Sequence, residues 1–289
     1  MARRPRARGD RLVTLTSDLG SAYAAQVKAA LITGGVAPSQ VIDLTHDLPA
    51  HSLCEAAFLL REMARRFPPL AVHIAIVDPG VGGRRAPVTV ETRAGPLLVG
   101  PDNGILAPLA EELGVRATYR IDPARLRRPP PVGTTFDGRD LFAPAAALLA
   151  GGVRPSALGP ATELRRYSIP EARRTATGAR GEVLHVDRFG NLITNVPSPW
   201  IGPNVVRLTL AFGRGRLRAV PFVTSYESLG RGVLGALASS FGLVEVAVGE
   251  GRAADRLGVG VGAAVRLGWR RRPAARTEKA NSARPRKRR

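Results

Sequence analysis

The sequence is poor in the residues that mark several large classes of protein. Its single cysteine, Cys54, excludes a disulfide framework within the chain. One cysteine in a chain of this length is typical of a reducing compartment, so we expect a cytoplasmic protein. No run of about 18 apolar residues is present, which argues against a membrane-spanning helix. The basic start, MARRPRARGD, precedes no apolar segment of the kind that a secretory signal needs.

Aromatic residues make up only 5% of the chain, too few for a surface on which nucleic-acid bases stack. The net charge of +20 is concentrated at the ends: residues 1–11 carry +4 and residues 270–289 carry +9. Basic segments of this composition are usually solvated and disordered. We therefore expect two disordered basic ends, whose contacts are at most weak ones with anions.

Motifs for common metals and cofactors are also missing. His46 and His51 flank a short loop, but no HxxxH spacing and no cysteine pair accompany them. The glycine-rich stretch GVGGRR at 80–85 lacks the Lys-Ser/Thr of a phosphate-binding loop and the spacing of a dinucleotide fingerprint. No G-x-S-x-G nucleophile motif occurs. We expect a protein with no metal ion and no cofactor.

What the sequence does contain is an alternation of apolar runs and helical patterns in its first 165 residues. Strands are predicted at 12–17, 40–45, 71–77, 87–92 and 96–100, and helices at 24–33, 53–67, 105–114 and 140–152. Strands that alternate with helices indicate an α/β layer with a mainly parallel sheet.

The pattern changes after this region. A segment rich in Pro, Gly and charge is followed by short strands with Gly or Pro between them, which is typical of a small β-barrel or sandwich. We expect an α/β domain with a mainly parallel sheet, followed by a smaller β-barrel-like domain. The expected boundaries are a basic end at 1–11, the α/β domain at 12–167, a linker at 168–181, the β domain at 182–269 and a basic tail at 270–289.

Four polar segments with glycine lie at the ends of predicted strands and helices in the first domain. They are SDLG at 17–20, VDPGVGGRR at 77–85, GPDNG at 100–104 and TTFDGRD at 134–140. In a parallel sheet, ligands bind outside the carboxyl ends of the strands, where Asp18 and Asp78 are expected. Each segment alone is equally well explained as a turn or a helix cap, as for Asp140 before Leu141.

The sharpest feature of the second domain is VDRFGNLITNV at 186–196. Phe-Gly-Asn between two strand-like runs predicts a tight turn that carries one aromatic ring and one amide. Two interpretations stay open. The turn is a plain hairpin, or it binds a ligand, with Phe189 covering a flat ring and Asn191 holding a polar group.

Together, these motifs resemble the S-adenosyl-L-methionine (SAM) hydroxide adenosyltransferases, the adenosine-forming SAM hydrolases that are related to fluorinase and chlorinase. TSDLG, VDPGVGGRR, GPDNG, TFDGRD and DRFGNLITN occur in the family's order, and the resemblance runs from about residue 12 to residue 268. It implies an α/β domain and a β-barrel-like domain. It further implies a trimer in which SAM lies between domains of neighbouring subunits, and a metal-free attack of water or hydroxide on the ribose C5′.

The resemblance also implies roles for individual residues. Asp78 and Arg85 match two members of the family's water-activating triad, and Asp137 occupies the position of the third. The residues matched to substrate binding are Asp18 for the ribose hydroxyls, Asp187 for the methionine amine, Phe189 and Asn191 for the adenosine and methionine portions, and Ser240 for the methionine end.

Two departures from the family pattern leave alternatives open. Asp137 stands where the family usually has histidine, and the stretch after SDLG is about two residues short, so an acidic residue that contacts the methionine amine has no counterpart. One alternative is a non-catalytic sensor of SAM or adenosine. Another is a synthase that uses a halide at the same carbon, against which the Asp78–Arg85 pair argues.

Overall fold

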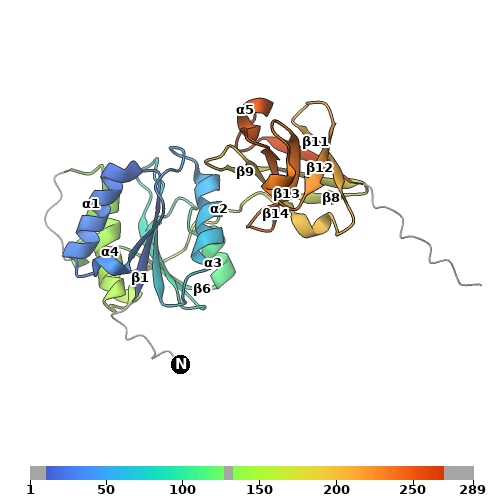
Figure 1. The fold of residues 1–289 in the computed structure, drawn as a ribbon. Helices are drawn as coiled ribbons and strands as arrows, with labels where there is room; N and C mark the ends of the chain where they lie inside the picture. Colours follow the sequence, from blue (N-terminus) through green and yellow to red (C-terminus); the bar gives the residue numbers. More distant parts are fainter. Residues whose placement is uncertain (1–10, 127–132, 270–289) are drawn as a thin grey trace, which may run out of the picture. The chain divides into compact units, whose positions relative to one another are not determined.

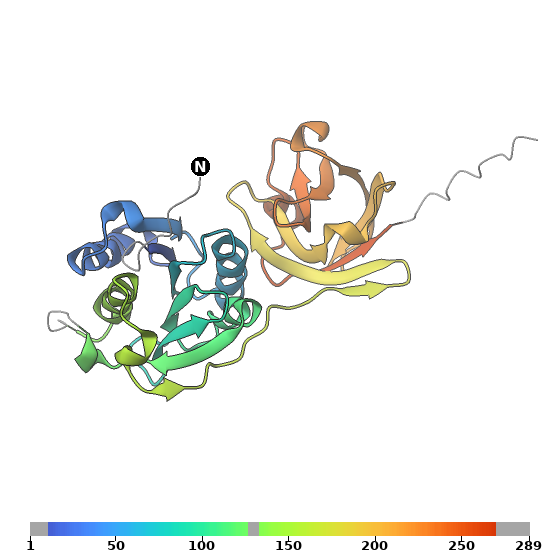
Figure 2. The ribbon, with the colours of Figure 1, turned by 90° about the horizontal axis from the view of Figure 1, so that it is seen from below.

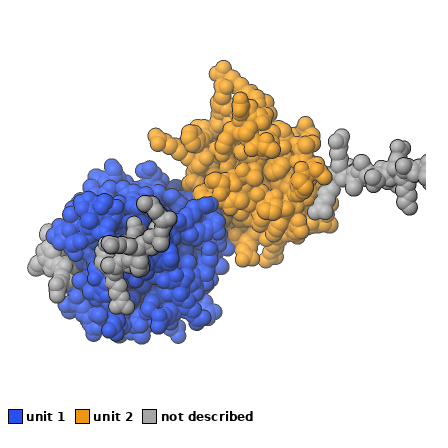
Figure 3. Space-filling view, turned by 60° about the horizontal axis from the view of Figure 1, so that its bottom comes forward, with its two compact units in different colours: residues 1–169 blue, residues 170–289 orange. Residues whose placement is uncertain are grey.

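The computed structural model describes residues 11–126 and 133–269. The chain forms two compact units, residues 1–169 and 170–289, coloured blue and orange in Figure 3. Both basic ends, 1–11 and 270–289, fall outside the described residues apart from Arg11. Within the described ranges, no helix is long and apolar enough to cross a membrane.

Unit 1 is built on one seven-stranded sheet with the strand order β2-β1-β3-β5-β4-β6-β7. β2, β1, β3 and β5 are parallel, whereas β4, β6 and β7 pair in antiparallel fashion. The strands are β1 (Leu12–Ser17), β2 (Val41–Thr45), β3 (Ala71–Ile76), β4 (Pro87–Thr92), β5 (Leu97–Pro101), β6 (Val115–Arg120) and β7 (Ala161–Thr162).

Helices cover both faces of this sheet, as the expected α/β layer requires. In Figure 1, α1 (Gly20–Thr33) and α4 (Ala143–Ala150) lie on one face, and α2 (Leu53–Ala64) and α3 (Ala107–Leu113) lie on the other. Val13 and Leu15 point from β1 toward α1, where they join Val27 and Leu31 in a fully buried cluster. Burial of four such side chains stabilises this face by several kcal/mol, at about 1.5–3 kcal/mol for each.

The helix before α4 is not a regular α-helix. Residues Gly138–Phe142 form a π-helical turn, η3, in which the Ala143 N–H donates to the Gly138 carbonyl. The sequence predicts a helix over 140–152, and the structure divides this region into η3 and α4. Gly138 is buried, and a Cβ there would lie 3.1 Å from Ile76 Cδ1, so the turn packs closely on the end of β3.

Unit 2 is the smaller β-barrel-like domain that the sequence predicts. Seven strands close in the order β10-β14-β13-β12-β11-β15-β9, because β9 also pairs with β10, and β8 adds to β9 on the outside. Figure 2 shows these strands curling around a common core. They are β8 (Arg173–Thr175), β9 (Gly178–Val186), β10 (Leu192–Pro197), β11 (Arg207–Phe212), β12 (Arg218–Val223), β13 (Leu234–Ala238), β14 (Leu243–Val248) and β15 (Ala264–Gly268), with one short helix, α5 (Ala253–Leu257).

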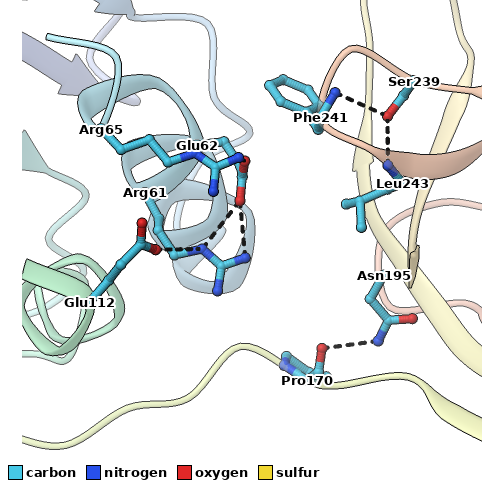
Figure 4. Close-up of polar contacts among 9 residues, drawn as sticks. All are labelled: Arg61, Glu62, Arg65, Glu112, Pro170, Asn195, Ser239, Phe241 and Leu243. Carbon is cyan, nitrogen blue, oxygen red and sulfur yellow. Dashed lines mark hydrogen bonds and ion pairs between the residues drawn. The ribbon is translucent and has the colours of Figure 1, made fainter. Parts of the chain in front are cut away.

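The segment predicted as a linker, 168–181, contains ordered structure in its second half. β8 and the first residues of β9 form a hairpin there, and residues 178–182 of β9 pair with β15. Asn195 anchors the start of the unit: its Nδ2 donates to the Pro170 carbonyl (2.9 Å), and its Oδ1 accepts from the Glu182 N–H (2.9 Å), the former bond drawn in Figure 4. Hydrogen bonds with β15 order this part of the segment, and its composition alone does not predict that pairing.

An ionic cluster joins the two helices on one face of unit 1. Glu62 of α2 is buried and pairs with Arg61 (3.1 Å) and with Arg65, which caps the end of the helix. Arg61 Nε reaches Glu112 of α3 at 3.9 Å, as Figure 4 shows. Glu62 is almost inaccessible, and these arginines supply the counter-charge that a buried carboxylate needs. Arg61 thus links α2 to α3.

Candidate active site

The parallel strands place the first polar residues at one edge of the unit 1 sheet. Asp18 follows the carboxyl end of β1, and Asp78 follows that of the adjacent β3. β4 runs the opposite way, so its beginning at Pro87 pairs with Pro101 at the end of β5. Arg85, just before β4, therefore lies at the same edge as the two aspartates.

Arg85 holds two carboxylates that are distant in the sequence. Its Nε donates to both Asp78 oxygens at 3.0 and 2.9 Å, and its Nη2 donates to Asp78 Oδ2 and to Asp137 Oδ2. The exposed fractions of the three side chains are 10% for Arg85, 6% for Asp78 and 13% for Asp137. The structure therefore brings together the three residues that the sequence matched to the family triad.

The charge of Arg85 is secured by its partners. Burial works to lower the pKa of the guanidinium, but hydrogen bonds from it to Asp78 and Asp137 outweigh burial, and the pKa is raised above its ordinary value. The ring of Phe142, fully buried, lies 5.6 Å from the guanidinium carbon and adds a cation–π contact. One permanent cation thus sits between two anions and reduces their mutual repulsion.

The glycines of 80–83 bring the Asp78 loop against the segment that carries Asp137. Gly82 has φ +72°, and a Cβ there would lie 2.8 Å from the Thr134 carbonyl oxygen. What the geometry shows is a close approach between two loops of unit 1, which a side chain at Gly82 would prevent.

The remaining polar side chains of the GPDNG and TTFDGRD segments have partners of their own. The Asn103 amide donates to the Val77 carbonyl (2.8 Å), next to Asp78, and Asp102 accepts from the Arg165 N–H (2.8 Å). Arg139 and Asp140 form a two-bond ion pair (2.7 and 2.9 Å). The Asn103 bond thus ties the GPDNG segment to the chain beside Asp78.

Asp18 retains capacity to bind a ligand. Among the described residues, one hydrogen bond reaches its carboxylate, from the backbone N–H of His51 to Oδ2 at 3.0 Å. A carboxylate has about four acceptor positions, so three remain. A pair of adjacent hydroxyl groups could occupy two of them.

Unit 2 contains a second set of predicted residues at the turn between β9 and β10. Asp187 Oδ1 accepts from the N–H groups of Phe189 (2.9 Å) and Asn191 (2.8 Å), and Oδ2 accepts from the Asn191 amide (3.0 Å). Gly190 has φ +79°, and a Cβ there would lie 2.7 Å from Arg252 Cβ. The turn is thus rigid, and it leaves the Phe189 ring 73% exposed.

A pocket of about 760 Å³ opens at this turn. Asp187, Phe189 and Asn191 line it together with Tyr226. Ser240 lies elsewhere, in the turn between β13 and β14, and is not among the lining residues. In that turn, the neighbouring Ser239 hydroxyl accepts from the Phe241 and Leu243 N–H groups, both at 3.3 Å (Figure 4).

Sequence reasoning missed two polar residues beside this pocket. Tyr226 donates its hydroxyl to Glu245 Oε1 at 2.6 Å. Burial and this hydrogen bond raise the pKa of the Tyr226 phenol. Burial also raises the pKa of the Glu245 carboxyl, which the Tyr226 bond opposes and nearby Asp187 reinforces. The available signal was a single glutamate inside the apolar strand LVEVAV, where a charge needs a partner.

A metal centre finds no ligand set in the described part of the chain: no group of three or more His, Cys, Asp or Glu side chains is suitably placed there. The His46 imidazole instead contacts the Ser17 hydroxyl, and the His51 backbone N–H contacts Asp18.

Comparison with known proteins matches both units. Residues 13–159 match the model of the SAM hydroxide adenosyltransferase N-terminal domain, and residues 181–266 match that of the C-terminal domain. A protein of Thermus thermophilus named (R)-S-adenosyl-L-methionine hydrolase is 39% identical over 268 residues, which cover 89% of this chain and 99% of that protein.

A fluorinase of an Actinoplanes species is more distant, at 25% identity over 222 residues, 66% of this chain and 73% of that enzyme. Among solved structures, an uncharacterised conserved protein from Thermotoga maritima aligns with a TM-score of 0.81 and 28% identity. That alignment covers 89% of this chain and 99% of that one.

Proposed function

The chain belongs to the SAM hydroxide adenosyltransferase family, and on this premise we propose that it hydrolyses SAM at the ribose C5′, giving adenosine and L-methionine. The observation that carries the proposal is the Asp78–Arg85–Asp137 cluster, held at the same sheet edge as Asp18. Relatives named (R)-S-adenosyl-L-methionine hydrolase match nearly their whole length, which supports the same reaction.

The reaction needs little beyond alignment. A water oxygen attacks C5′ while the C5′–S bond breaks, and the bonding electron pair goes to sulfur, which leaves as the neutral thioether of methionine. The attacking water loses one proton, so the products are adenosine and methionine. Because the sulfonium is already a good leaving group, positioning the water opposite that bond and accepting its proton are the main tasks of the protein.

Asp78 and Asp137 are assigned to the water. Both carboxylates can accept a hydrogen bond from it, and Asp78 takes its proton. Arg85 contacts both carboxylates and fixes their orientation, since its Nη2 atom donates a hydrogen bond to each of them. Asp137 thereby takes the place of the family histidine as an acceptor for the same water. Preorganised groups of this kind need no rearrangement in the transition state.

Binding is assigned to both units. Asp18 accepts hydrogen bonds from the two ribose hydroxyls through its unused positions. Asp187 has about one acceptor position left after its three bonds within the turn, which suits the methionine ammonium group. Phe189 is exposed and can cover the adenine ring, and Asn191 contacts the substrate beside it. Ser240 is assigned to the methionine end on the resemblance alone, since it does not line the pocket at Asp187.

The assembly that goes with this assignment is a homotrimer in which unit 1 of one subunit and unit 2 of another enclose SAM. The reaction uses SAM as substrate, with no cofactor or metal, and the protein acts in the cytoplasm. Light scattering tests the assembly: about three times the mass of one chain is expected. An active monomer would contradict the inter-subunit site.

Incubating the purified full-length protein with SAM and separating the products by chromatography tests the activity. Adenosine and methionine should appear in equal amounts, and Asp78→Asn should abolish most of their formation. Added fluoride or chloride should leave the products unchanged. A 5′-halogenated nucleoside would identify a halide-using synthase instead, and tight binding of SAM with no product would identify a sensor.

A further inference from the structure

A chain of polar side chains in unit 1 ends directly beside Asp18. Lys28 of α1 donates to Asp43 Oδ2 at 2.8 Å. His46 Nε2 lies 3.0 Å from Asp43 Oδ1, an ion-pair distance without good hydrogen-bond alignment. His46 Nδ1 and the Ser17 hydroxyl are joined by a hydrogen bond of 2.7 Å. The chain therefore links α1, β2 and the tip of β1.

The backbone of β2 explains how His46 reaches this position. β1 and β2 pair in parallel with Leu15 opposite Asp43, but the next pair is Thr16 opposite Thr45, so one residue of β2 bulges out. This shift of one residue brings His46 level with Ser17 instead of one position beyond it. The bulge thus creates the contact between the imidazole and the hydroxyl.

The order Ser-His-Asp invites comparison with a hydrolytic triad, but the burial of Ser17 excludes that role. Ser17 is 1% exposed, and its hydroxyl also accepts weakly from the Leu19 N–H at 3.4 Å. A nucleophile has to reach a substrate atom. The hydroxyl instead faces inward and ties its own strand to His46.

The loop that follows β2 also holds the residues around Asp18 through its backbone. The His46 carbonyl accepts from the Gly20 N–H at 3.1 Å, and the His51 N–H donates to Asp18 Oδ2 at 3.0 Å. His51 has φ +66°, a conformation that costs a non-glycine residue on the order of 1 kcal/mol. The His46 side chain thus contacts Ser17, the residue before Asp18, and the His46 carbonyl contacts Gly20, the second residue after Asp18.

We propose that His46 is the positioning residue for Asp18, fixing the backbone on both sides so that the carboxylate meets the ribose hydroxyls already oriented. The assignment rests on the proposed function. A carboxylate held in its binding geometry loses less conformational freedom when ligand arrives, which raises affinity. Asp43 anchors the imidazole. Its burial tends to raise its pKa, but contacts with Lys28 and His46 prevail and the pKa is lowered, so Asp43 stays charged.

Adenosine binding to the full-length protein, measured by calorimetry, tests the assignment. His46→Ala should raise the adenosine Kd about tenfold, the factor that corresponds to about 1.4 kcal/mol and thus to one hydrogen bond. His46→Asn should restore most of the affinity, because the asparagine amide can occupy the place of Nδ1 beside Ser17. His46→Gln, whose amide corresponds to Nε2, should restore less.

Kinetics with SAM supply a second reading. In His46→Ala the KM for SAM should rise more than kcat falls, because Asp18 acts in binding and not on the water.

A matched pair of variants distinguishes a loss of Asp18 positioning from a general loss of stability. Ser17→Ala and Thr14→Val each remove a hydroxyl on β1 that is bonded to a histidine, at 2.7 and 2.8 Å. Both should lower the melting temperature, but only Ser17→Ala should raise the adenosine Kd.

The outcomes separate this assignment from the proposed function. If the parent protein releases adenosine from SAM while His46→Ala and Ser17→Ala bind adenosine with the parent Kd, the positioning role is wrong and the hydrolase activity stands. If Thr14→Val weakens binding as much as Ser17→Ala, the effect is general destabilisation and the assignment also fails. If the parent neither binds adenosine nor converts SAM, both proposals fall together.

Discussion

Asp78 and Asp137 share one nitrogen atom, Nη2 of Arg85, although they belong to two separate loops of the chain. Within the described residues, the guanidinium joins the two carboxylates directly. Its removal would leave two buried anions facing each other without a counter-charge, which is among the most destabilising changes that a site can undergo. The pair and its cation therefore form a single unit, and they should respond to mutation as one.

The first prediction concerns the kinetics of this unit. Asp137→Ala should lower kcat more than it changes KM, and Asp78→Asn should do so more severely, because the proposal assigns both to the attacking water in the transition state. The double variant should be little worse than Asp78→Asn alone, since residues in one network are not additive. Steady-state assays of adenosine release measure all three.

Asp137→His supplies the control, because it installs the residue that the family usually has at this position. It should retain more activity than Asp137→Ala. If Asp137→Ala turns over SAM at the parent rate, Asp137 is a turn residue only, and the water must be held by Asp78 and Arg85.

The second prediction is that Asp18→Ala weakens binding of SAM and of adenosine alike. A loss of about 1–3 kcal/mol corresponds to a charge-assisted hydrogen bond with a buried partner. Asp18→Asn should lose less, since one amide oxygen still accepts. Unchanged adenosine affinity in calorimetry would remove Asp18 from the ribose site.

The third prediction concerns the basic tail. A protein that ends at residue 269 should keep the kcat and KM of the full chain, because every residue assigned to the reaction lies upstream and both family matches end before it. Assays at equal protein concentration make the comparison. A truncated protein that folds but does not turn over SAM would show that the tail contributes to the site.

The fourth prediction is a pH dependence of stability that arises from His73. This histidine of β3 is fully buried, and burial lowers its pKa from 6.5 to about 4. Between pH 6.5 and pH 4, the His73 imidazole is protonated in the unfolded chain but stays neutral in the folded protein. His73 therefore contributes stability that is complete above pH 6.5 and is lost as the pH falls toward 4, by about 3 kcal/mol in all.

Urea unfolding between pH 7 and pH 4 measures this effect. The double variant Thr14→Val/His73→Leu should lose less stability over that range than Thr14→Val, which keeps the histidine but lacks its hydroxyl partner. Equal pH slopes in the two proteins would show that His73 is not the titrating group.

The elements that sequence reasoning located are those with strong local patterns. The apolar run of β3 and the helical face of α2 are placed within a few residues of their observed ends. Sequence reasoning missed two strands. β6 has the half-exposed sequence VRATYR, and β13 has the sequence LGALA, which has little β propensity and pairs with β12 and β14. Both segments form strands because neighbouring strands pair with them.

The site was predictable where strand order decides position. Asp18 and Asp78 meet one edge because β1 and β3 are parallel neighbours, and that follows from the alternation of strands and helices. Asp137 is different, since nothing local in its segment indicates that Arg85 lies beside it; the resemblance to the family grouped them. The contact of His46 with Ser17 depends on a bulge in β2, which the residue pattern does not predict.

The direction in which the Asp137 side chain points depends on the number of residues in the π-helical turn at Gly138–Phe142. Such a turn accommodates one residue more than the α-helix that continues from it. Loss of one residue from this turn would let α4 extend backward as a regular helix and would rotate the preceding chain by about 100°. Asp137 would then point away from Arg85 with every chemical group still present. Insertions and deletions here are therefore as consequential for activity as substitutions of the acids themselves.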